Sequence, residues 1–184
     1  PLSMFANRSI SIGIYVLVVC AADPFLPVLA TGPTCSGQTF GTLQTISITA
    51  GVDTTFDITN CNHNAGLVVT ATGAVNGFIA TIASSGFTTL SFTVTMQASS
   101  SLTIADSTFT AVTTISNSYT SSALSFYRNT MTQITLSTAN FFSASLFDMQ
   151  NNTMTCASYC VYISASHINT NSLHRYAGNT ITAV

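Results

Sequence analysis

The tetrapeptide NTMT occupies residues 129–132 and 152–155, and the variant NTIT occupies residues 179–182. An earlier copy, STFT, stands at 107–110, and a weaker one, SGFT, at 85–88. The first residues of these copies follow one another at intervals of 22, 22, 23 and 27. Self-similarity with a period of about 20 to 50 residues is typical of solenoids and repeat arrays. The sequence therefore predicts a stacked repeat fold.

Each strong copy is preceded by a leucine that begins another short apolar strand: Leu102, Leu124, Leu146 and Leu173. Polar and apolar residues alternate inside each unit, and this period of two indicates strands rather than helices. One leucine per unit is too few for a leucine-rich repeat, and the interval is too short for a propeller blade of about 40 residues. We predict an all-β fold, a right-handed parallel β-helix of about six coils with a period of 22–27 residues.

Equivalent residues of successive coils should form columns along the axis, because neighbouring strands lie about 4.8 Å apart. One predicted column is apolar and points inward: Phe109, Met131, Met154 and Ile181. A second column stands at the turn: Asn129, Asn152 and Asn179, with Ser107 at its end. Stacked amides hydrogen-bond from coil to coil, so we interpret these asparagines as a structural ladder.

Charge is nearly absent from the chain. Only 4% of the residues are charged, compared with about 25% in an average soluble domain. The cations are Arg8, Arg128 and Arg175, too few and too scattered to follow nucleic-acid phosphates or an anionic membrane surface. A hydrophobic content of 47% is ample for a buried core. We expect no nucleic acid among the partners.

Residues 1–22 have the layout of a secretory signal, with translation beginning at Met4. Arg8 supplies the positive region, residues 10–19 the apolar region, and residues 20–22 the small side chains of a cleavage site. The run is shorter than the roughly 20 residues that span a bilayer, although a retained anchor and a buried strand remain alternatives. Residues 23–184 would then be one β-helix domain, truncated at its C-terminus, that is secreted or displayed at the cell surface. Any membrane contact would come through the signal segment or through missing regions.

Four cysteines remain after removal of the signal, and an even number in an exported chain favours disulfides. Cys35 and Cys61 lie 26 residues apart, about one coil, and are expected to pair. Cys156 and Cys160 would form a local second pair. A metal site built from the latter two and His167 is a weaker alternative, since Cys-x3-Cys-x6-His fits no usual zinc spacing. We expect no metal and no cofactor.

Residues 146–182 read LFDMQNNTMTCASYCVYISASHINTNSLHRYAGNTIT and resemble repeats of the dispersed gene family of trypanosomatid surface proteins. The resemblance rests on N-N-T-x-T turns, cysteine pairs and a near absence of Lys and Glu, and it extends over residues 100–184. It implies a pectate-lyase-like β-helix and an adhesive surface protein, of which this chain would be a short relative, a pseudogene product or a fragment. Residues 126–129, FYRN, also fit the F-x-x-N motif of bacterial polymorphic outer-membrane passengers, but their companion G-G-A motif is missing.

A carbohydrate-active enzyme, lyase or hydrolase, is the first functional alternative, because folds of this kind often carry such sites. These reactions need clustered carboxylates and a base. Only Asp53 and Asp57 are close in sequence, while Asp106 and Asp148 belong to different registers and are interpreted as solvated turn residues. His63 is assigned to a surface turn, and the sequence contains no nucleophile motif for a triad.

We therefore expect a non-enzymatic protein of adhesion or surface display that binds a glycan or a host or cell-surface protein. The period expands between residues 156 and 172, and inserted residues in a solenoid emerge as a loop, often on the binding face. Side chains that stack or hydrogen-bond gather there and just beyond it: Tyr159, Tyr162, His167, His174 and Arg175. The alternative is that Tyr162 and Ile163 are ordinary core of a third strand.

Two further expectations concern the turns. Thr-x-Thr pairs at 93/95, 108/110, 130/132, 153/155 and 180/182 would project outward in two ranks, as in ice-binding solenoids. An ice-binding Thr ladder is thus the second functional alternative, although Thr is also simply a good strand residue. Asn151 begins an N-glycosylation sequon, the only one outside the signal segment.

Overall fold

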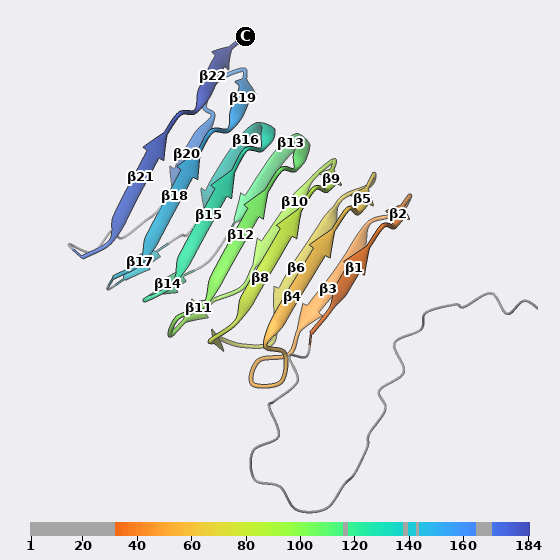
Figure 1. Cartoon of the computed structure of the whole chain (residues 1–184), viewed down its shortest axis with the longest axis vertical. Coiled ribbons are helices and arrows are strands. Elements are labelled where there is room, and N and C mark those ends of the chain that lie inside the picture. Colours follow the sequence, from red (N-terminus) through yellow and green to blue (C-terminus); the bar gives the residue numbers. More distant parts are fainter. Residues whose placement is uncertain (1–31, 116–117, 138–139, 143, 165–170) are drawn as a thin grey trace, which may run out of the picture.

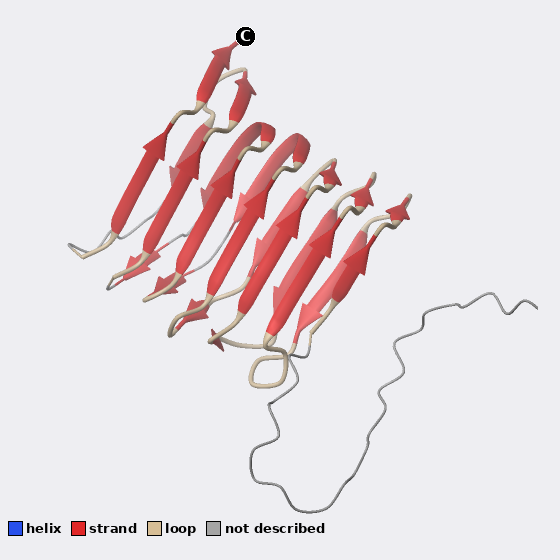
Figure 2. Cartoon of the chain, viewed as in Figure 1, coloured by secondary structure: helices blue, strands red, loops and turns tan. Residues whose placement is uncertain are grey.

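The fold is seen in a computed structural model that describes residues 32–115, 118–137, 140–142, 144–164 and 171–184. The signal-like segment, residues 1–22, lies outside the described residues. Within those ranges the chain forms strands and turns only (Figure 2). The described part contains no helix of the length and hydropathy that a membrane crossing requires.

Three parallel sheets run along one axis, and the chain passes from sheet to sheet in every coil (Figure 1). Sheet A has seven strands: β1 (Thr34–Ser36), β4 (Thr55–Thr59), β8 (Ile79–Ala83), β12 (Ser101–Ala105), β15 (Ala123–Tyr127), β18 (Leu146–Gln150) and β21 (Leu173–Ala177). Seven strands in one sheet correspond to about six full turns of a parallel β-helix. The register repeats every 22 to 27 residues, which confirms the predicted fold and period.

Sheet B has 11 strands, because most coils cross it in two pieces: β2 (Thr39–Phe40), β3 (Gln44–Ile48), β5 (Asn62–His63), β6 (Leu67–Ala71), β9 (Gly86–Phe87), β10 (Leu90–Thr93), β13 (Thr108–Ile115), β16 (Thr130–Ser137), β19 (Thr153–Cys156), β20 (Val161–Ser164) and β22 (Thr180–Ala183). In β13 and β16 the two pieces merge into one long strand. Sheet C has four short strands: β7 (Val75–Asn76), β11 (Met96–Gln97), β14 (Ser118–Thr120) and β17 (Asn140–Phe142).

Alternation of side chains divides each strand of sheet A between core and solvent. In β12, Leu102 and Ile104 are fully buried, while the residues between and beside them face outward. The register shows that Leu124 stacks on Leu102, but Leu146 and Leu173 do not continue this column. The four leucines that the sequence marks therefore do not occupy equivalent positions. Leu146 and Leu173 are the first residues of their strands, whereas Leu102 and Leu124 are the second residues of theirs. A shift of one residue moves a side chain to the opposite face of the sheet.

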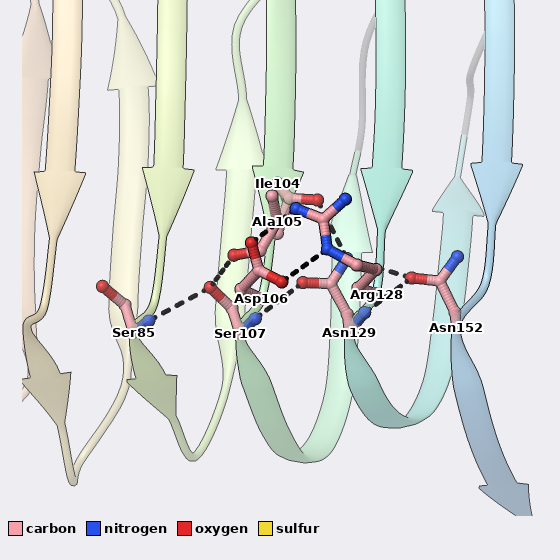
Figure 3. Close-up of polar contacts among 8 residues, drawn as sticks. All are labelled: Ser85, Ile104, Ala105, Asp106, Ser107, Arg128, Asn129 and Asn152. Carbon is pink, nitrogen blue, oxygen red and sulfur yellow. Dashed lines mark hydrogen bonds and ion pairs between the residues drawn. The ribbon is translucent and has the colours of Figure 1, made fainter.

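From β4 onward, a two-residue turn joins each strand of sheet A to the next strand of sheet B. Its first residue has a left-handed backbone, with φ between 50° and 63°: Asn60, Ser84, Asp106, Arg128, Asn151 and Gly178. Its second residue belongs to what we call the turn column: Cys61, Ser85, Ser107, Asn129, Asn152 and Asn179. The left-handed residue turns the chain sharply enough for the next side chain to point inward, between the coils (Figure 3).

Hydrogen bonds run along the turn column from one coil to the next (Figure 3). The backbone N–H groups of Asn129 and Asn152 each donate to the Oδ1 atom of the asparagine in the following coil, at 2.9 Å. The Nδ2 atom of Asn152 donates to the Phe126 carbonyl at 3.0 Å, so the side-chain amide also holds the sheet A strand of the preceding coil. Ser85 and Ser107 continue the series with hydroxyl acceptors. The structure thus places the predicted ladder asparagines in a longer mixed column.

An inward stack of rings continues the predicted apolar column toward the N-terminal coils. Phe109, Met131 and Met154 are in register and buried, whereas Ile181, in the last coil, is 61% exposed. His63 lies in the same column, between the rings of Phe40 and Phe87, with centroid distances of 4.8 and 5.1 Å. Its assignment to a surface turn is wrong, because the second residue after each turn-column position faces the core. His63 is 1% exposed, and neither ring nitrogen has a hydrogen-bond partner.

Two disulfides lie at opposite ends of the described solenoid. Cys35 in β1 is bonded to Cys61, with a Cα–Cα distance of 6.4 Å. The register partner of Cys35 is Ile58, so this bond reaches from a strand to the turn of the next coil rather than between equivalent positions. Cys156 and Cys160 form the local pair, with Cα atoms 5.3 Å apart.

The turn column should be needed for stability. Asn152→Leu removes the oxygen that accepts the Asn129 amide and the donor that satisfies the Phe126 carbonyl. A buried polar group without a partner costs about 1 to 3 kcal/mol, so we expect the free energy of unfolding in urea to fall by about 2 to 4 kcal/mol. The control Thr153→Val, at an exposed neighbour, should change it by less than about 0.5 kcal/mol. Equal stability of Asn152→Leu and the native chain would contradict the ladder.

Burial of His63 should make stability depend on pH. Desolvation lowers its pKa below 6.5, so the unfolded chain binds the proton at a higher pH than the folded chain. The free energy of unfolding should therefore decrease as the pH falls below that value. His63→Phe continues the ring stack and should raise stability by about 1 kcal/mol while flattening the pH dependence. Some slope should remain, since burial also lowers the pKa of His174. Urea titrations at several pH values would measure the free energy of unfolding of both proteins. The same pH dependence in His63→Phe as in the native chain would refute the prediction.

Candidate functional site

The outward side chains of sheet B form an extended surface of hydroxyl and methyl groups. They belong to β3, β6, β10, β13, β16 and β20 and stand in two ranks, which we together call the hydroxyl face. The first rank is Thr45, Val68, Ser91, Thr114, Thr135 and Tyr162. The second rank is Ser47, Thr70, Thr93 and Ser137.

The ranks are regular because the strands are paired without interruption in this half of the sheet. The single register shift between β13 and β16 falls between Phe109 and Val112, before Thr114. Neighbouring members of the first rank are therefore about 4.8 Å apart along the axis, and the two ranks about 6.6 Å apart along the strands. In the second rank Thr93 and Ser137 stand two coils apart, because residue 116 lies outside the described residues. Every member is exposed or half-buried, and none is charged. The face can donate and accept hydrogen bonds at each coil and carries no fixed charge.

Aromatic side chains border the hydroxyl face at one end. Tyr162 continues the first rank after Thr135 and is 44% exposed, so the alternative that assigned it to the core is wrong. Ile163, assigned with it, does pack against the core from β20 (Val161–Ser164). Tyr159 is 62% exposed, and its ring centroid lies 5.7 Å from that of Tyr162. The Cys156–Cys160 disulfide closes the short loop that carries Tyr159. Two adjacent exposed rings thus lie beside a row of hydroxyl groups.

The sequence singled out a different set of threonines. Thr108, Thr130, Thr153 and Thr180 do stand in register at the start of the sheet B strands, and all are exposed. The second threonines of these pairs are not in one continuous row, because the bulge after Phe109 interrupts the register between Thr110 and Thr132. Thr132 is also half-buried. The pair at 93/95 does not belong to it, because Thr93 lies in β10 and pairs with Thr70. The regular hydroxyl surface is therefore on the other half of the sheet.

The residues predicted as one binding cluster do not come together. His174 and Tyr176 in β21 stack over Phe147 and Met149, so they face the interior of the last coil. Arg175 stands above Asp148 in sheet A, whereas Tyr162 belongs to sheet B. His167 lies outside the described residues. Of the five predicted binding residues, the structure brings together only the two tyrosines.

Asp148 is the centre of a polar cluster on the outer face of sheet A. Its side chain is fully buried and is ion-paired with Arg175, through both Nε and Nη2, from the following coil. The Tyr127 hydroxyl donates to Asp148 at 2.9 Å, and Gln150 Nε2 donates at 2.9 and 3.1 Å. These donors, led by Arg175, lower the pKa of Asp148 to about 2 against the opposing effect of burial.

Asp148 is therefore not the solvated turn residue that the sequence indicated. It occupies the middle of β18, and its neighbours cover it. A carboxylate with this pKa and both oxygens engaged stays ionised and holds structure; it is poorly suited to act as a general acid or base near neutral pH. The Asp148–Arg175 pair joins β18 to β21 of the next coil on sheet A. The turn column joins successive coils in the same way at the turn.

The other described carboxylates also have partners nearby. Asp106 and Arg128, the left-handed residues of adjacent turns, form a bidentate pair with both contacts at 2.7 Å (Figure 3). This pair is exposed, so its contribution to stability is small. Asp53 accepts the Thr49 amide, and Asp57 accepts the Thr59 hydroxyl. Across the described ranges no three His, Cys, Asp or Glu side chains are placed to hold a metal ion.

Asn151 lies at the exposed first position of its turn, with φ of 55°. Its Oδ1 atom occupies the space that a Cβ at residue 178 would need, and residue 178 is a glycine with φ of 63°. Glycosylation of Asn151 stays a prediction.

A scan against protein-family models, a search of curated proteins and a search of solved structures find no match to this chain.

The Asp148–Arg175 pair should be coupled in stability. Arg175→Ala leaves a buried carboxylate without its cation, so we expect the melting temperature to fall by several °C. Adding Asp148→Ser, which copies Ser125 of the coil below, should restore most of that loss. In the native chain the carboxylate's contribution is fully present above pH 3.8 and is lost as the pH falls toward about 2. Differential scanning calorimetry would measure both effects. If the change in melting temperature of the double variant equalled the sum of the changes in the two single variants, the coupling would be contradicted.

Proposed function

We propose that this chain is a non-enzymatic, secreted or cell-surface β-helix that acts in adhesion or surface display. The observation that carries the proposal is the hydroxyl face of sheet B, with the paired rings of Tyr159 and Tyr162 at its end. We further propose that this face binds a neutral, hydroxyl-rich partner, a glycan of a cell surface.

The chemistry of the face supports this class of partner. Each Ser or Thr hydroxyl both donates and accepts a hydrogen bond, as a sugar hydroxyl does. Exposed tyrosine rings stack on the apolar face of a sugar and keep a polar tip in water. The face carries no charge, which favours a neutral glycan over an acidic one, and a solenoid presents it as a long, continuous surface.

Export is supported by two features. The first 22 residues have the pattern of a secretory signal. The chain also carries two disulfides, which persist in oxidising compartments such as the extracellular space.

A second candidate function, binding to ice, is favoured by the same two ranks. Hydroxyl and methyl groups recur at about 4.8 Å along the axis, in an array that other solenoids use against ordered water. Thermal hysteresis of the purified chain, lost on Thr114→Arg, would assign this function in place of glycan binding.

Charge placed on the hydroxyl face should abolish adhesion. The double variant Thr114→Arg and Thr135→Arg puts two guanidinium groups in the first rank, and we expect at least about a tenfold loss of affinity. Thr81→Arg with Thr103→Arg is the matched control, since these threonines have the same outward placement on sheet A. Binding to an array of neutral and acidic glycans would be measured, with circular dichroism to verify folding. Equal losses in the two double variants would contradict the proposal.

The same preparation separates adhesion from catalysis. Calcium-dependent cleavage of polygalacturonate, abolished by Asp148→Ala or Arg175→Ala, would replace the adhesive function with an enzymatic one.

A further inference from the structure

The first rank of the hydroxyl face runs along the axis of the solenoid. Its members come from β3, β6, β10, β13, β16 and β20, which lie side by side in that order (Figure 1). The register joins them at every step. Intervals of about 4.8 Å give the rank a length of about 24 Å, whereas the two ranks lie only about 6.6 Å apart along the strands. A partner that touches many coils at once must therefore lie along the axis.

The fold itself leaves the hydroxyl groups of this rank available. Serines at the turns donate to carbonyls of their own coil. By contrast, the hydroxyls of Thr45, Ser91 and Thr114 have no hydrogen-bond partner within the described ranges. Thr135 accepts a hydrogen bond from Gln133 Nε2 at 3.3 Å, and its own O–H remains a donor. Each of these coils thus presents a hydroxyl group that can serve an external ligand.

We propose that the first rank holds an extended, unbranched, β-linked neutral glycan that lies along the solenoid axis, with about one sugar residue on each coil. The inference rests on the proposed function and names the form of its partner. A β-linked hexopyranose in an extended chain advances by about the height of one coil, so sugars and hydroxyl groups stay in step. Because each Ser or Thr hydroxyl both donates and accepts, the rank tolerates sugars that are turned over from one residue to the next.

Shape and charge select this class of glycan among others. Val68 and Tyr162, the apolar members of the rank, pack against the C–H groups of a sugar ring. A helical, α-linked glycan curves away from a straight rank and touches only a few coils. An acidic glycan finds no cation on the face, because Arg128 stands at a turn and Arg175 in sheet A.

A length series tests the orientation on the whole chain. Cello- and chito-oligosaccharides from trimers to hexamers would be titrated by isothermal titration calorimetry, with maltohexaose as the α-linked control. Each added residue gains hydrogen bonds to one more coil, so we expect the affinity for the better series to rise about threefold per residue. Maltohexaose should bind no better than the trimers. Equal affinity from trimer to hexamer, or equal binding of maltohexaose and the β-linked hexamer, would overturn the proposal.

A charge moved along the rank gives a sharper test. Ser91→Arg divides the rank and leaves a run of three members, from Thr114 onward, so the affinity should stop rising at about the trimer. Thr45→Arg is the matched control at the end of the rank and leaves a run of five, so the rise should continue to about the pentamer. Thr103→Arg, which lies on sheet A, should leave the series unchanged.

Circular dichroism would verify that each variant folds. If Ser91→Arg does not fold, Thr114→Arg divides the rank one coil later, leaves three members on the other side and should give the same limit.

The outcomes separate this inference from the proposed function. If the native chain binds the oligosaccharides, but Ser91→Arg and Thr45→Arg weaken all lengths alike, adhesion stands and the axial arrangement is wrong. If neither series binds, while other glycans bind through the hydroxyl face, the glycan class named here is wrong. If no glycan of any class binds, the proposed function itself is overturned.

Discussion

From Ser85 to Asn179, a side-chain oxygen at each turn fixes how one coil of this protein lies on the coil before it. The left-handed residue that opens the turn directs the following Asn or Ser inward, where it meets the backbone amide of the coil before it. Asparagine suits the position best, because its second amide atom also holds a strand carbonyl, as Asn152 holds Phe126. Ser85 and Ser107 fill the position in earlier coils, where each hydroxyl accepts the amide of the preceding coil and donates to a carbonyl of its own coil. Cys61 fills it with a disulfide to Cys35.

Because the register between successive coils is fixed, equivalent residues of the repeats line up and form continuous surfaces. Because side chains alternate with a period of two, holding each coil in place keeps hydrophobic residues inside and hydroxyl residues outside over the whole length of sheet B. The hydroxyl face exists only because Thr45, Ser91 and Thr135 are kept in line across coils whose loops differ in length. The same stacking buries His63 between the rings of Phe40 and Phe87, and Asp148 beneath Arg175. The neighbouring coils, rather than solvent, therefore surround these two polar side chains.

Much of the architecture could be predicted from the sequence, because the NTMT copies mark equivalent positions directly. The interval between them gave the period, and their Asn and Met residues gave two of the columns. The sequence was less informative where position, not residue type, decides the environment. His63 and Asp148 are polar residues near turns, yet one lies inside a core column and the other is covered by side chains from neighbouring coils. The hydroxyl face was missed for a related reason: Ser91 and Thr135 lack a distinctive neighbour, and only their spacing by whole coils would have revealed them.

Amide hydrogen exchange tests most directly whether the turn column holds the coils together. If it does, the turn amides of Ser85, Ser107, Asn129 and Asn152 exchange as slowly as the amides of the central strands of sheet A. Rapid exchange at all of these turns, with protection confined to the strands, would show that the column is an accident of packing and that the sheets alone keep the coils in register.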